Sequence, residues 1–179
     1  MAALVATGIL SADGYVVDAS GSFAWAEPDD EVHAFVNALE RQVSTYLCGR
    51  RLYEVMSFWD APPEGLSDVA AEFAAGWREA DKIVVSTTLE AVDAPRTTLV
   101  RSFDPSLVTE LPGVASIGGP TLAAAAFEAG VVDEVQLLAV PHLAGGGTRF
   151  FPDGFSSSLT LLDERRFTGG TVYTRYRVG

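Results

Sequence analysis

The stretch VASIGGPTLAAAAFEA, residues 114–129, decides the fold class of this 179-residue chain. It begins with a short apolar run, Val114–Ile117, which is typical of a buried strand. Two glycines end that run, and a proline and an alanine-rich segment follow. Proline suits the first turn of a helix, because the amide that it lacks would have no partner there. The stretch therefore predicts a strand, a glycine turn and a helix over Thr121–Ala129.

Strand-like and helix-like segments alternate along most of the chain. Apolar or β-branched runs predict strands at Ala3–Leu10, Thr45–Cys48, Lys82–Ser86, Thr97–Val100 and Glu134–Val140. Apolar residues three or four positions apart predict a helix that starts at Asp29 or Asp30 and runs along Val32, Phe35, Val36, Leu39 and Val43, and further helices at Arg51–Met56 and Leu66–Ala80. This alternation favours an α/β fold with a mainly parallel sheet that helices cover on both faces.

The C-terminal part of the chain has a different pattern. Strand-like runs at Leu159–Leu162 and Thr171–Val178 are joined by Thr168-Gly169-Gly170. Glycines in so short a connection indicate an antiparallel hairpin. Because no internal repeat, low-complexity tract or linker interrupts the chain, we expect residues 1–179 to form a single domain.

The charge of the chain restricts its partners. The sequence has 24 acidic and 12 basic residues, a formal net charge of −12 and a pI near 4.4. Such a chain has no broad basic surface, so we expect no nucleic-acid partner and no anionic membrane partner. Cys48 is the single cysteine, which excludes an intrachain disulfide, and the chain opens without a cationic leader. These features predict a cytoplasmic protein.

Three strand ends could bind an anionic ligand, since ligands of open α/β sheets bind beyond the carboxyl ends of the strands. Gly49-Arg50-Arg51 offers a glycine and two guanidinium groups for a phosphate, or else a plain helix start with solvated arginines. Ser86-Thr87-Thr88 offers hydroxyls for a phosphate or for capping a turn. Gly118-Gly119-Pro120-Thr121 offers backbone amides at a helix N-terminus for a pyrophosphate, although tight packing explains the glycines equally well.

Other residues suggest less. His33 and His142 have no metal-ligand spacing, so no metal site is expected. Trp25, beside a loop, either lines a pocket for a flat ligand or packs structurally. Asp13, at the end of the first strand, either reaches a substrate or forms an Asp-Gly turn.

The order of these segments resembles the dihydrofolate-reductase-like superfamily over nearly the whole chain. Within it, the chain is most similar to bacterial proteins related to the C-terminal reductase domain of the riboflavin-biosynthesis deaminase/reductase. The resemblance rests on six motifs in order: Ser11-Ala12-Asp13-Gly14-Tyr15-Val16, Gly49-Arg50-Arg51-Leu52-Tyr53-Glu54, Val84-Val85-Ser86-Thr87-Thr88-Leu89, Ile117-Gly118-Gly119 with Leu122, Val132-Asp133-Glu134-Val135, and Gly145-Gly146-Gly147-Thr148-Arg149-Phe150-Phe151.

The resemblance implies a three-layer α/β/α fold with an eight-stranded, mostly parallel sheet, and NADPH as cofactor. It implies three groups of cofactor-binding residues. Gly49 and Arg50 would approach the cofactor phosphates, with Arg50, Ser86 and Thr87 near the adenosine 2′-phosphate. Arg51 is a further cofactor-binding candidate. Gly118, Gly119, Thr121 and Leu122 would hold the pyrophosphate. Ala6 and Val16 would border the nicotinamide.

The activity implied is hydride transfer from NADPH to a C=N or C=O bond of a small heterocyclic substrate. Asp13 and Asp30 are the catalytic candidates, and Trp25 and His33 are the substrate-binding candidates. Folate reductases pair a carboxylate of the first helix with the pterin, and here either Asp30 or His33 matches that position. Near Leu138 the chain is apolar where folate reductases carry a threonine, which argues against folate. The relation to the riboflavin reductase implies a ribosylated pyrimidine instead. The alternative is a non-catalytic nucleotide-binding or ligand-sensing module. Relatives of this kind form homodimers, so a homodimer is expected.

Overall fold

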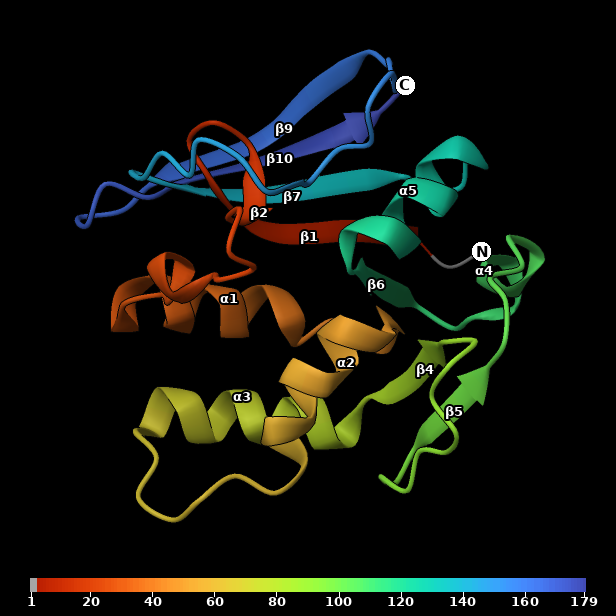
Figure 1. The fold of residues 1–179 in the computed structure, drawn as a ribbon. Helices are drawn as coiled ribbons and strands as arrows, with labels where there is room; N and C mark the ends of the chain where they lie inside the picture. Colours follow the sequence, from red (N-terminus) through yellow and green to blue (C-terminus); the bar gives the residue numbers. More distant parts are fainter. Residues whose placement is uncertain (1–2) are drawn as a thin grey trace.

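An eight-stranded sheet forms the centre of the protein in the computed structural model, which describes residues 3–179 (Figure 1). The strand order is β5-β4-β3-β6-β1-β7-β10-β9. All neighbours from β5 to β7 pair in parallel, whereas β10 pairs antiparallel with both β7 and β9. The expected mostly parallel sheet with an antiparallel C-terminal hairpin is therefore confirmed. The strands are β1 (Ala3–Ser11), β3 (Val43–Gly49), β4 (Asp81–Val85), β5 (Thr97–Val100), β6 (Val114–Gly118), β7 (Glu134–Val140), β9 (Leu159–Arg166) and β10 (Val172–Val178).

Helices cover both faces of this sheet. Successive side chains of a strand point to opposite faces, so each face has its own apolar cluster. In β3, Tyr46 and Cys48 pack in one apolar cluster with Trp77 of α3, whereas Leu47 packs in another with Ala123 of α5. Figure 1 shows α1, α2 and α3 together on one side of β1 and β7. The helices are α1 (Asp30–Glu40), α2 (Arg50–Met56), α3 (Asp68–Glu79), α4 (Ser106–Glu110) and α5 (Pro120–Glu128), with short 3-10 turns η1 (Ala24–Ala26) and η2 (Ser57–Asp60).

The first helix starts as predicted but ends earlier. Asp29 is its N-cap, and the Asp29 carboxylate accepts a hydrogen bond of 2.9 Å from the amide of Val32. The predicted continuation to Val43 is wrong, since α1 ends at Glu40 and Val43 opens β3. The apolar side chain of Val43 fits the helical spacing by coincidence, and it packs instead on the α2–α3 side of the sheet.

The sequence patterns missed three short elements and one long strand end. A second, two-stranded sheet pairs β2 (Tyr15–Val17) with β8 (Thr148–Arg149), and α4 was also not expected. These elements have two to five residues, too few for a periodic pattern. Strand β9 continues to Arg166, four residues beyond the predicted end at Leu162. The second half of β9 consists of charged residues, which the sequence pattern did not assign to a strand. An edge strand that is exposed to solvent tolerates charged side chains, whereas a buried strand does not.

Gly8 in β1 allows Phe150 to pack directly against the centre of the sheet. A Cβ atom on Gly8 would lie 2.5 Å from Cε2 of Phe150. Phe150 is 5% exposed and stacks edge-on against Phe151 at a centroid distance of 4.9 Å. The segment that follows β8 is thus fixed over the carboxyl half of β1.

Replacing Gly8 by Ala is expected to lower the free energy of unfolding by about 1–3 kcal/mol, because the added methyl group overpacks this contact. Urea denaturation measures the change. The loss should be smaller when Phe150 is also Leu. Gly76→Ala in α3 is the control, since nothing lies within 4 Å of its Cβ position, and it should stabilise the protein by about 0.5–1 kcal/mol. An equal loss from Gly8→Ala in both backgrounds would contradict the role of Phe150.

Candidate functional site

Two helix N-termini meet where β3 and β6 end. Cys48 and Gly118 are partners in the parallel pairing of these strands, and α2 and α5 begin directly after them. Gly119, the N-cap of α5, has a φ of 91°, a conformation that favours glycine. A Cβ atom on Gly119 would lie 3.5 Å from the amide nitrogen of Gly49, the N-cap of α2. The two glycine backbones are therefore in close approach.

Both helix ends favour an anion. Neither N-cap makes a side-chain hydrogen bond to its helix, so no side chain of the cap serves the first amide groups. The positive ends of two helix dipoles point to the same place. Helices α2 and α5 also leave adjacent strands towards opposite faces of the sheet, which is the switch point where open α/β sheets bind ligands. This junction is the centre of the candidate site.

Arg50 joins this junction to the segment that follows β4. Its Nη1 atom donates a hydrogen bond of 2.9 Å to Oγ1 of Thr88, and its Nε atom lies 3.1 Å from a carboxylate oxygen of Glu54. The buried hydroxyl of Ser86 accepts from the amides of Thr88 and Leu89 at 3.2 and 3.0 Å. The structure therefore brings together two of the predicted phosphate-binding segments. The Ser86 hydroxyl caps the turn, as one of the two sequence interpretations expected.

Two predicted neighbours of this phosphate position are exposed. Thr87 lies at the tip of the turn with its side chain in solvent, and Arg51 is exposed in the first turn of α2. Both are accessible to a ligand from outside, whereas Ser86 is only 6% exposed.

Arg101 is a site residue that the sequence patterns did not single out. Its guanidinium group donates to the backbone carbonyls of Ser86, Leu89 and Glu90, with distances of 3.2 Å to Ser86 and 3.2 Å to Glu90. These bonds hold the 86–90 turn in shape from the end of the neighbouring strand β5. One feature of the sequence could have indicated this role. Arg101 directly follows the predicted strand Thr97–Val100, and the preceding predicted strand ends at Ser86.

Asp13 connects the end of β1 to the loop after β7. Its carboxylate accepts hydrogen bonds from the Ser11 hydroxyl at 2.6 Å, the Ala144 amide at 3.0 Å and the Gly145 amide at 2.8 Å. These bonds, the Ser11 hydroxyl first among them, lower the pKa of Asp13 to about 2. The carboxylate is therefore ionised at neutral pH. Asp13 has a structural use in this loop, and its catalytic role stays a prediction.

The predicted substrate-binding residues lie against other rings. The Trp25 indole stacks on His142 with centroids 5.0 Å apart, and its buried Nε1 atom has no hydrogen-bond partner among the described residues. His33 of α1 packs against Phe73 and Trp59 at centroid distances of 5.6 and 6.2 Å. Burial lowers the pKa of His33, and the charge of Asp30 opposes this shift. Asp30 itself is exposed in the first turn of α1.

The remaining predicted cofactor residues lie in β1, β2 and α5. Ala6 is fully buried in β1 and pairs with Ile117 of β6, two residues before Gly119. Leu122 of α5 lies under Gly49, because a Cβ atom there would be 3.7 Å from Cβ of Leu122. Thr121 is exposed in the first turn of α5, and Val16 of β2 packs on the cluster beneath that helix.

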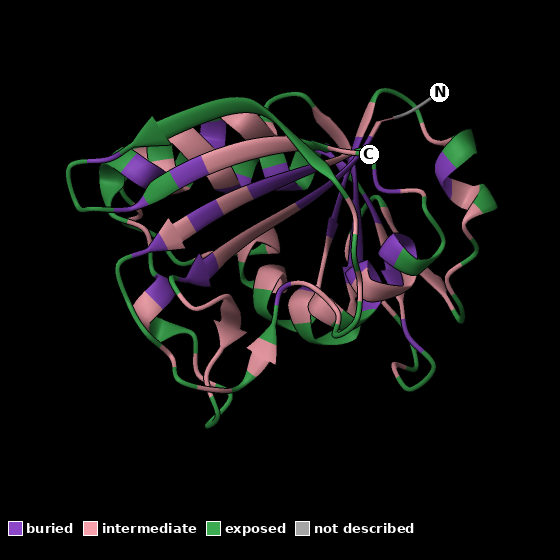
Figure 2. Cartoon of the chain, turned by 90° about the horizontal axis from the view of Figure 1, so that it is seen from above, coloured by how far each residue is buried: buried purple, intermediate pink, exposed green. Residues whose placement is uncertain are grey.

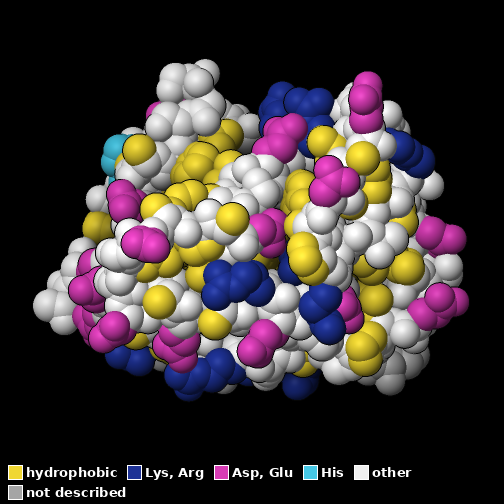
Figure 3. Space-filling view, turned by 90° about the horizontal axis from the view of Figure 1, so that it is seen from below, with side chains coloured by type: hydrophobic (Ala, Val, Ile, Leu, Met, Phe, Trp, Pro, Cys, Tyr) yellow, Lys and Arg dark blue, Asp and Glu magenta, His cyan; other side chains and the backbone are white. Residues whose placement is uncertain are grey.

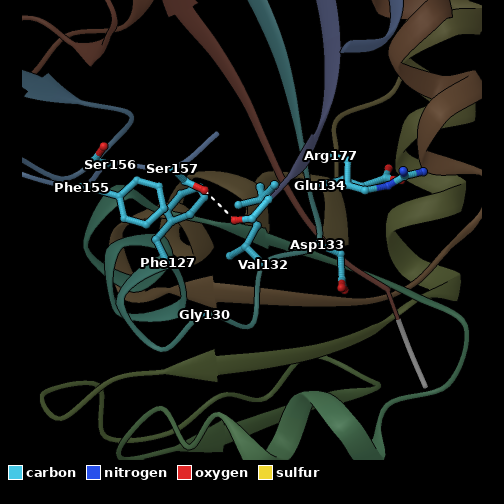
Figure 4. Close-up of a pocket in the computed structure, with 11 residues that line it drawn as sticks. Phe127, Gly130, Val132, Asp133, Glu134, Phe155, Ser156, Ser157 and Arg177 are labelled. Atoms are coloured by element: carbon cyan, nitrogen blue, oxygen red, sulfur yellow. Dashed lines mark hydrogen bonds between the residues drawn. The ribbon is translucent and has the colours of Figure 1, made fainter. Parts of the chain in front are cut away.

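Two cavities lie at the other end of the sheet. A cavity of about 470 Å³ is lined by residues from the start of β7 and the end of β10, including Asp133, Glu134 and Arg177 (Figure 4). A cavity of about 390 Å³ lies by the first residues of β4 and β5. Both are at the amino ends of the parallel strands, so neither coincides with the Gly49–Gly119 junction.

Three absences apply to residues 3–179. No helix in this range is long and apolar enough to cross a bilayer. No three His, Cys, Asp or Glu side chains in it are placed to hold a metal ion. On the face that Figure 3 shows, basic side chains form small groups among acidic ones rather than a continuous patch.

Comparison with known proteins identifies the family. The RibD C-terminal domain family matches residues 2–173. The chain belongs to this family. The expected relationship to the C-terminal domain of the riboflavin-biosynthesis enzyme is therefore confirmed. No protein of curated function matches the chain by sequence.

Solved structures show the same fold in relatives of this RibD C-terminal domain. A Shewanella sp. PV-4 protein assigned to riboflavin biosynthesis is 22% identical, with a TM-score of 0.76 and 99% of each chain covered. The Thermotoga maritima diaminohydroxyphosphoribosylaminopyrimidine deaminase/5-amino-6-(5-phosphoribosylamino)uracil reductase is 15% identical, with a TM-score of 0.67 over 99% of this chain and 57% of that one. Enterococcus faecalis dihydrofolate reductase, solved with NADP(H), is 14% identical, with a TM-score of 0.63 over 99% and 96%.

The Asp13 contacts predict a pH-dependent stabilisation. Asp13→Asn should lower the free energy of unfolding at neutral pH, since one of the two acceptor oxygens becomes an NH₂ group. The folded pKa of about 2 is below the ordinary 3.8, so the stabilisation is complete above 3.8 and is lost as the pH falls towards 2. Urea unfolding at about pH 7, about pH 5 and about pH 3 should give equal differences at the first two and a smaller one at the last.

Asp153→Asn, an exposed loop carboxylate, is the matched control and should change stability little at any of these pH values. A difference between Asp13→Asn and the wild type that stays constant down to the lowest pH would contradict the assignment.

Proposed function

We propose that this chain is an NADPH-dependent reductase that transfers a hydride to a C=N or C=O bond of a small heterocyclic substrate. The close approach of the Gly49 and Gly119 backbones carries this proposal. It places two helix N-termini without side-chain caps at one strand-end junction. The chain has only 12 basic residues, so backbone amide groups at helix N-termini would supply much of the binding of a dinucleotide's phosphates.

The residues present fit the polar parts of NADPH. Amides near Gly49, Gly118 and Gly119 would hold the diphosphate, with Thr121 and Leu122 at the start of α5. A second anion position lies beside Arg50, where a guanidinium group and the hydroxyls of the 86–88 turn come together. A guanidinium group binds a phosphate through paired hydrogen bonds, so Arg50 would distinguish the 2′-phosphate of NADPH from the hydroxyl of NADH. When bound, the cofactor supplies the hydride.

The chain's own part in the reaction is to bind, orient and exclude water. Hydride transfer needs donor and acceptor carbons in close contact in a dry environment. The buried backbone around Ala6 and the side chain of Val16 would form the apolar border of the nicotinamide position. The unpaired Nε1 atom of Trp25 would donate a hydrogen bond to a carbonyl oxygen of the substrate. Such oxygens are present in pyrimidines and pterins, the two substrate classes named for the solved relatives.

Proton transfer would come from the start of α1. Asp30 and His33 lie about one helical turn apart on α1, and the His33 ring contacts Trp59 of η2 and Phe73 of α3. The lowered pKa of His33 keeps its imidazole neutral at neutral pH. Asp30 is the proposed proton-handling carboxylate, acting through a water or directly, and His33 would contact the substrate.

Arg50→Ala tests the cofactor assignment. We expect the wild type to bind NADPH more tightly than NADH, and the variant to lose about tenfold to hundredfold in NADPH affinity, as a charge-assisted hydrogen bond would cost. Affinity for NADH should stay the same within about threefold. Fluorescence titration or calorimetry measures both. Arg96→Ala, which removes an exposed arginine at the amino end of β5, is the control and should change neither affinity. An equal loss for NADPH and NADH would contradict the assignment.

Turnover tests the reductase itself. NADPH oxidation should be detected with at least one acceptor from a panel of pterins, dihydropterins and ribosylated aminopyrimidines. Asp30→Asn should then lower kcat by about 100-fold, as loss of a general acid does, with little change in NADPH affinity. His33→Gln should raise KM more than it lowers kcat. Tight NADPH binding without oxidation by any acceptor would favour a non-catalytic nucleotide-binding module instead.

A further inference from the structure

A cavity lies at the amino ends of β3, β4 and β5, at the opposite end of these strands from the candidate site. Its volume is about 390 Å³. Thr45 of β3 and Asp81 of β4 are partners in the parallel pairing of their strands. Leu47 and Ile83, two residues further along, are also partners, and both pack in the apolar cluster beneath α5. Side chains two residues apart share a face, so the cavity is on the α5 side of the sheet.

Thr45 brings an unpartnered hydroxyl group to this cavity. Thr45 lines the cavity and is 1% exposed, and its buried Oγ1 atom has no hydrogen-bond partner in residues 3–179. Buried residues are concentrated in the central strands of the sheet, as Figure 2 shows. A hydroxyl group in such surroundings has little access to water, so leaving it unpaired costs free energy. A polar ligand in the cavity would supply the missing hydrogen bond.

An ion pair borders the same cavity. The Nη2 atom of Arg96 lies 2.9 Å from a carboxylate oxygen of Asp81, and the two side chains are 52 and 53% exposed. The ammonium group of Lys82 is directed elsewhere, since it donates to the carbonyls of Trp77 and Ala80. An exposed ion pair contributes little to stability. Both of its charged groups can therefore turn to a ligand at small cost.

The backbone of Arg96 has a conformation that suits glycine better than arginine. Its φ of 57° is the one positive value at a non-glycine residue in the part of the chain that the structure describes. The Arg96 carbonyl accepts a hydrogen bond of 2.7 Å from the Lys82 amide, so the backbone itself joins the start of β5 to β4. Glycine would form the same bond at lower conformational cost. The turn therefore requires no arginine, and the guanidinium group is available to a ligand.

These groups define one class of ligand. The Thr45 hydroxyl and the Asp81 carboxylate are hydrogen-bond acceptors on neighbouring strands, and an ammonium group donates three hydrogen bonds. The Arg96 guanidinium group suits a carboxylate. Ile83 and Leu111 add apolar surface to the lining. Cavities that hold small ligands have volumes of about 300–1,000 Å³, and this one is at the lower end of that range.

We propose that this cavity is a binding site for a free α-amino acid with an apolar side chain, such as leucine. The ammonium group lies between Thr45 and Asp81, and the carboxylate binds Arg96. The side chain packs on Ile83 and Leu111. An α-amino acid carries these three groups on a single carbon atom, so a small molecule can meet all of them at once. The site is separate from the candidate site and does not depend on the proposed reductase function.

L-Leucine and two of its fragments test the ligand class. Isoamylamine lacks the carboxylate, and isocaproate lacks the ammonium group. We expect L-leucine to bind at least about tenfold more tightly than either fragment, because each fragment has lost a charge-assisted hydrogen bond. NMR titration of the isotope-labelled protein measures the three dissociation constants. No binding of L-leucine, or equally tight binding of a fragment, would overturn the proposal.

Two substitutions test the assigned contacts. Thr45→Val keeps the shape of the side chain, removes the hydroxyl group and should raise the L-leucine dissociation constant about tenfold. It should not lower the free energy of unfolding, since the hydroxyl has no partner in residues 3–179. Arg96→Gly should raise the dissociation constant about tenfold or more without a marked loss of stability, because glycine suits the φ of this residue.

Matched controls are Thr160→Val and Arg166→Ala, which change exposed residues of the edge strand β9. Neither should change the L-leucine dissociation constant. NADPH affinity should stay the same in all four variants, so a failure of this site and a failure of the reductase proposal can be told apart. Urea denaturation measures the stability of each variant. A loss of stability in Thr45→Val with unchanged L-leucine affinity would show that the hydroxyl serves the fold alone, and that result, or unchanged affinity in Arg96→Gly, contradicts the proposed site.

Discussion

The contact between the backbones at Gly49 and Gly119 is the constraint on which the candidate site depends. Neighbouring parallel strands lie about 4.8 Å apart, so two helices that start directly after β3 and β6 have little room between their first turns. A Cβ atom at Gly119 would lie 3.5 Å from the Gly49 amide nitrogen, which is ordinary van der Waals contact, so the two helix starts are close neighbours. The φ of 91° at Gly119 is the condition that favours glycine there. The spacing of the strands therefore brings the backbone amides of two helix N-termini together, without the help of a charged side chain.

A shortage of positive charge explains how the rest of the site is built. With 12 basic residues against 24 acidic ones, the chain cannot surround an anion with cations. In the proposed function, helix ends would hold one anion and a single guanidinium group, Arg50, would hold the other. Arg101 contributes without facing that position, since its hydrogen bonds go to backbone carbonyls. Long-range attraction of an anionic cofactor would therefore be weak, and the proposed binding would rely on contacts made at short range.

Much of the fold could be predicted from sequence because its strands are buried and its helices are amphipathic. The run 114–117, the glycine turn and the helix after it behave as their composition suggests. Failures occur where burial does not decide the outcome. Val43 satisfied a helical spacing but belongs to a strand, and β9 continues through charged residues because no layer covers it.

The site was predictable only in part, for a related reason. Strand ends with glycine, arginine and hydroxyl groups can be found in one sequence, and the resemblance grouped Arg50 with Ser86 and Thr87. The structure brings Arg50 to the turn after Ser86, where it contacts Thr88. Contacts between loops far apart in the chain leave no such pattern. The hydrogen bonds from Ala144 and Gly145 to Asp13 span more than 130 residues, so nothing near Asp13 in the sequence announces them.

The way in which Arg101 holds the 86–90 turn has a consequence for how this protein could change over time. Main-chain carbonyls are present whatever the side chains are, so the support survives substitution within the turn. Thr87 and Thr88 can accordingly be replaced while Arg101 keeps the backbone of the turn in place. In the proposed reductase, preference for one nicotinamide nucleotide over another would then change through single replacements at this turn.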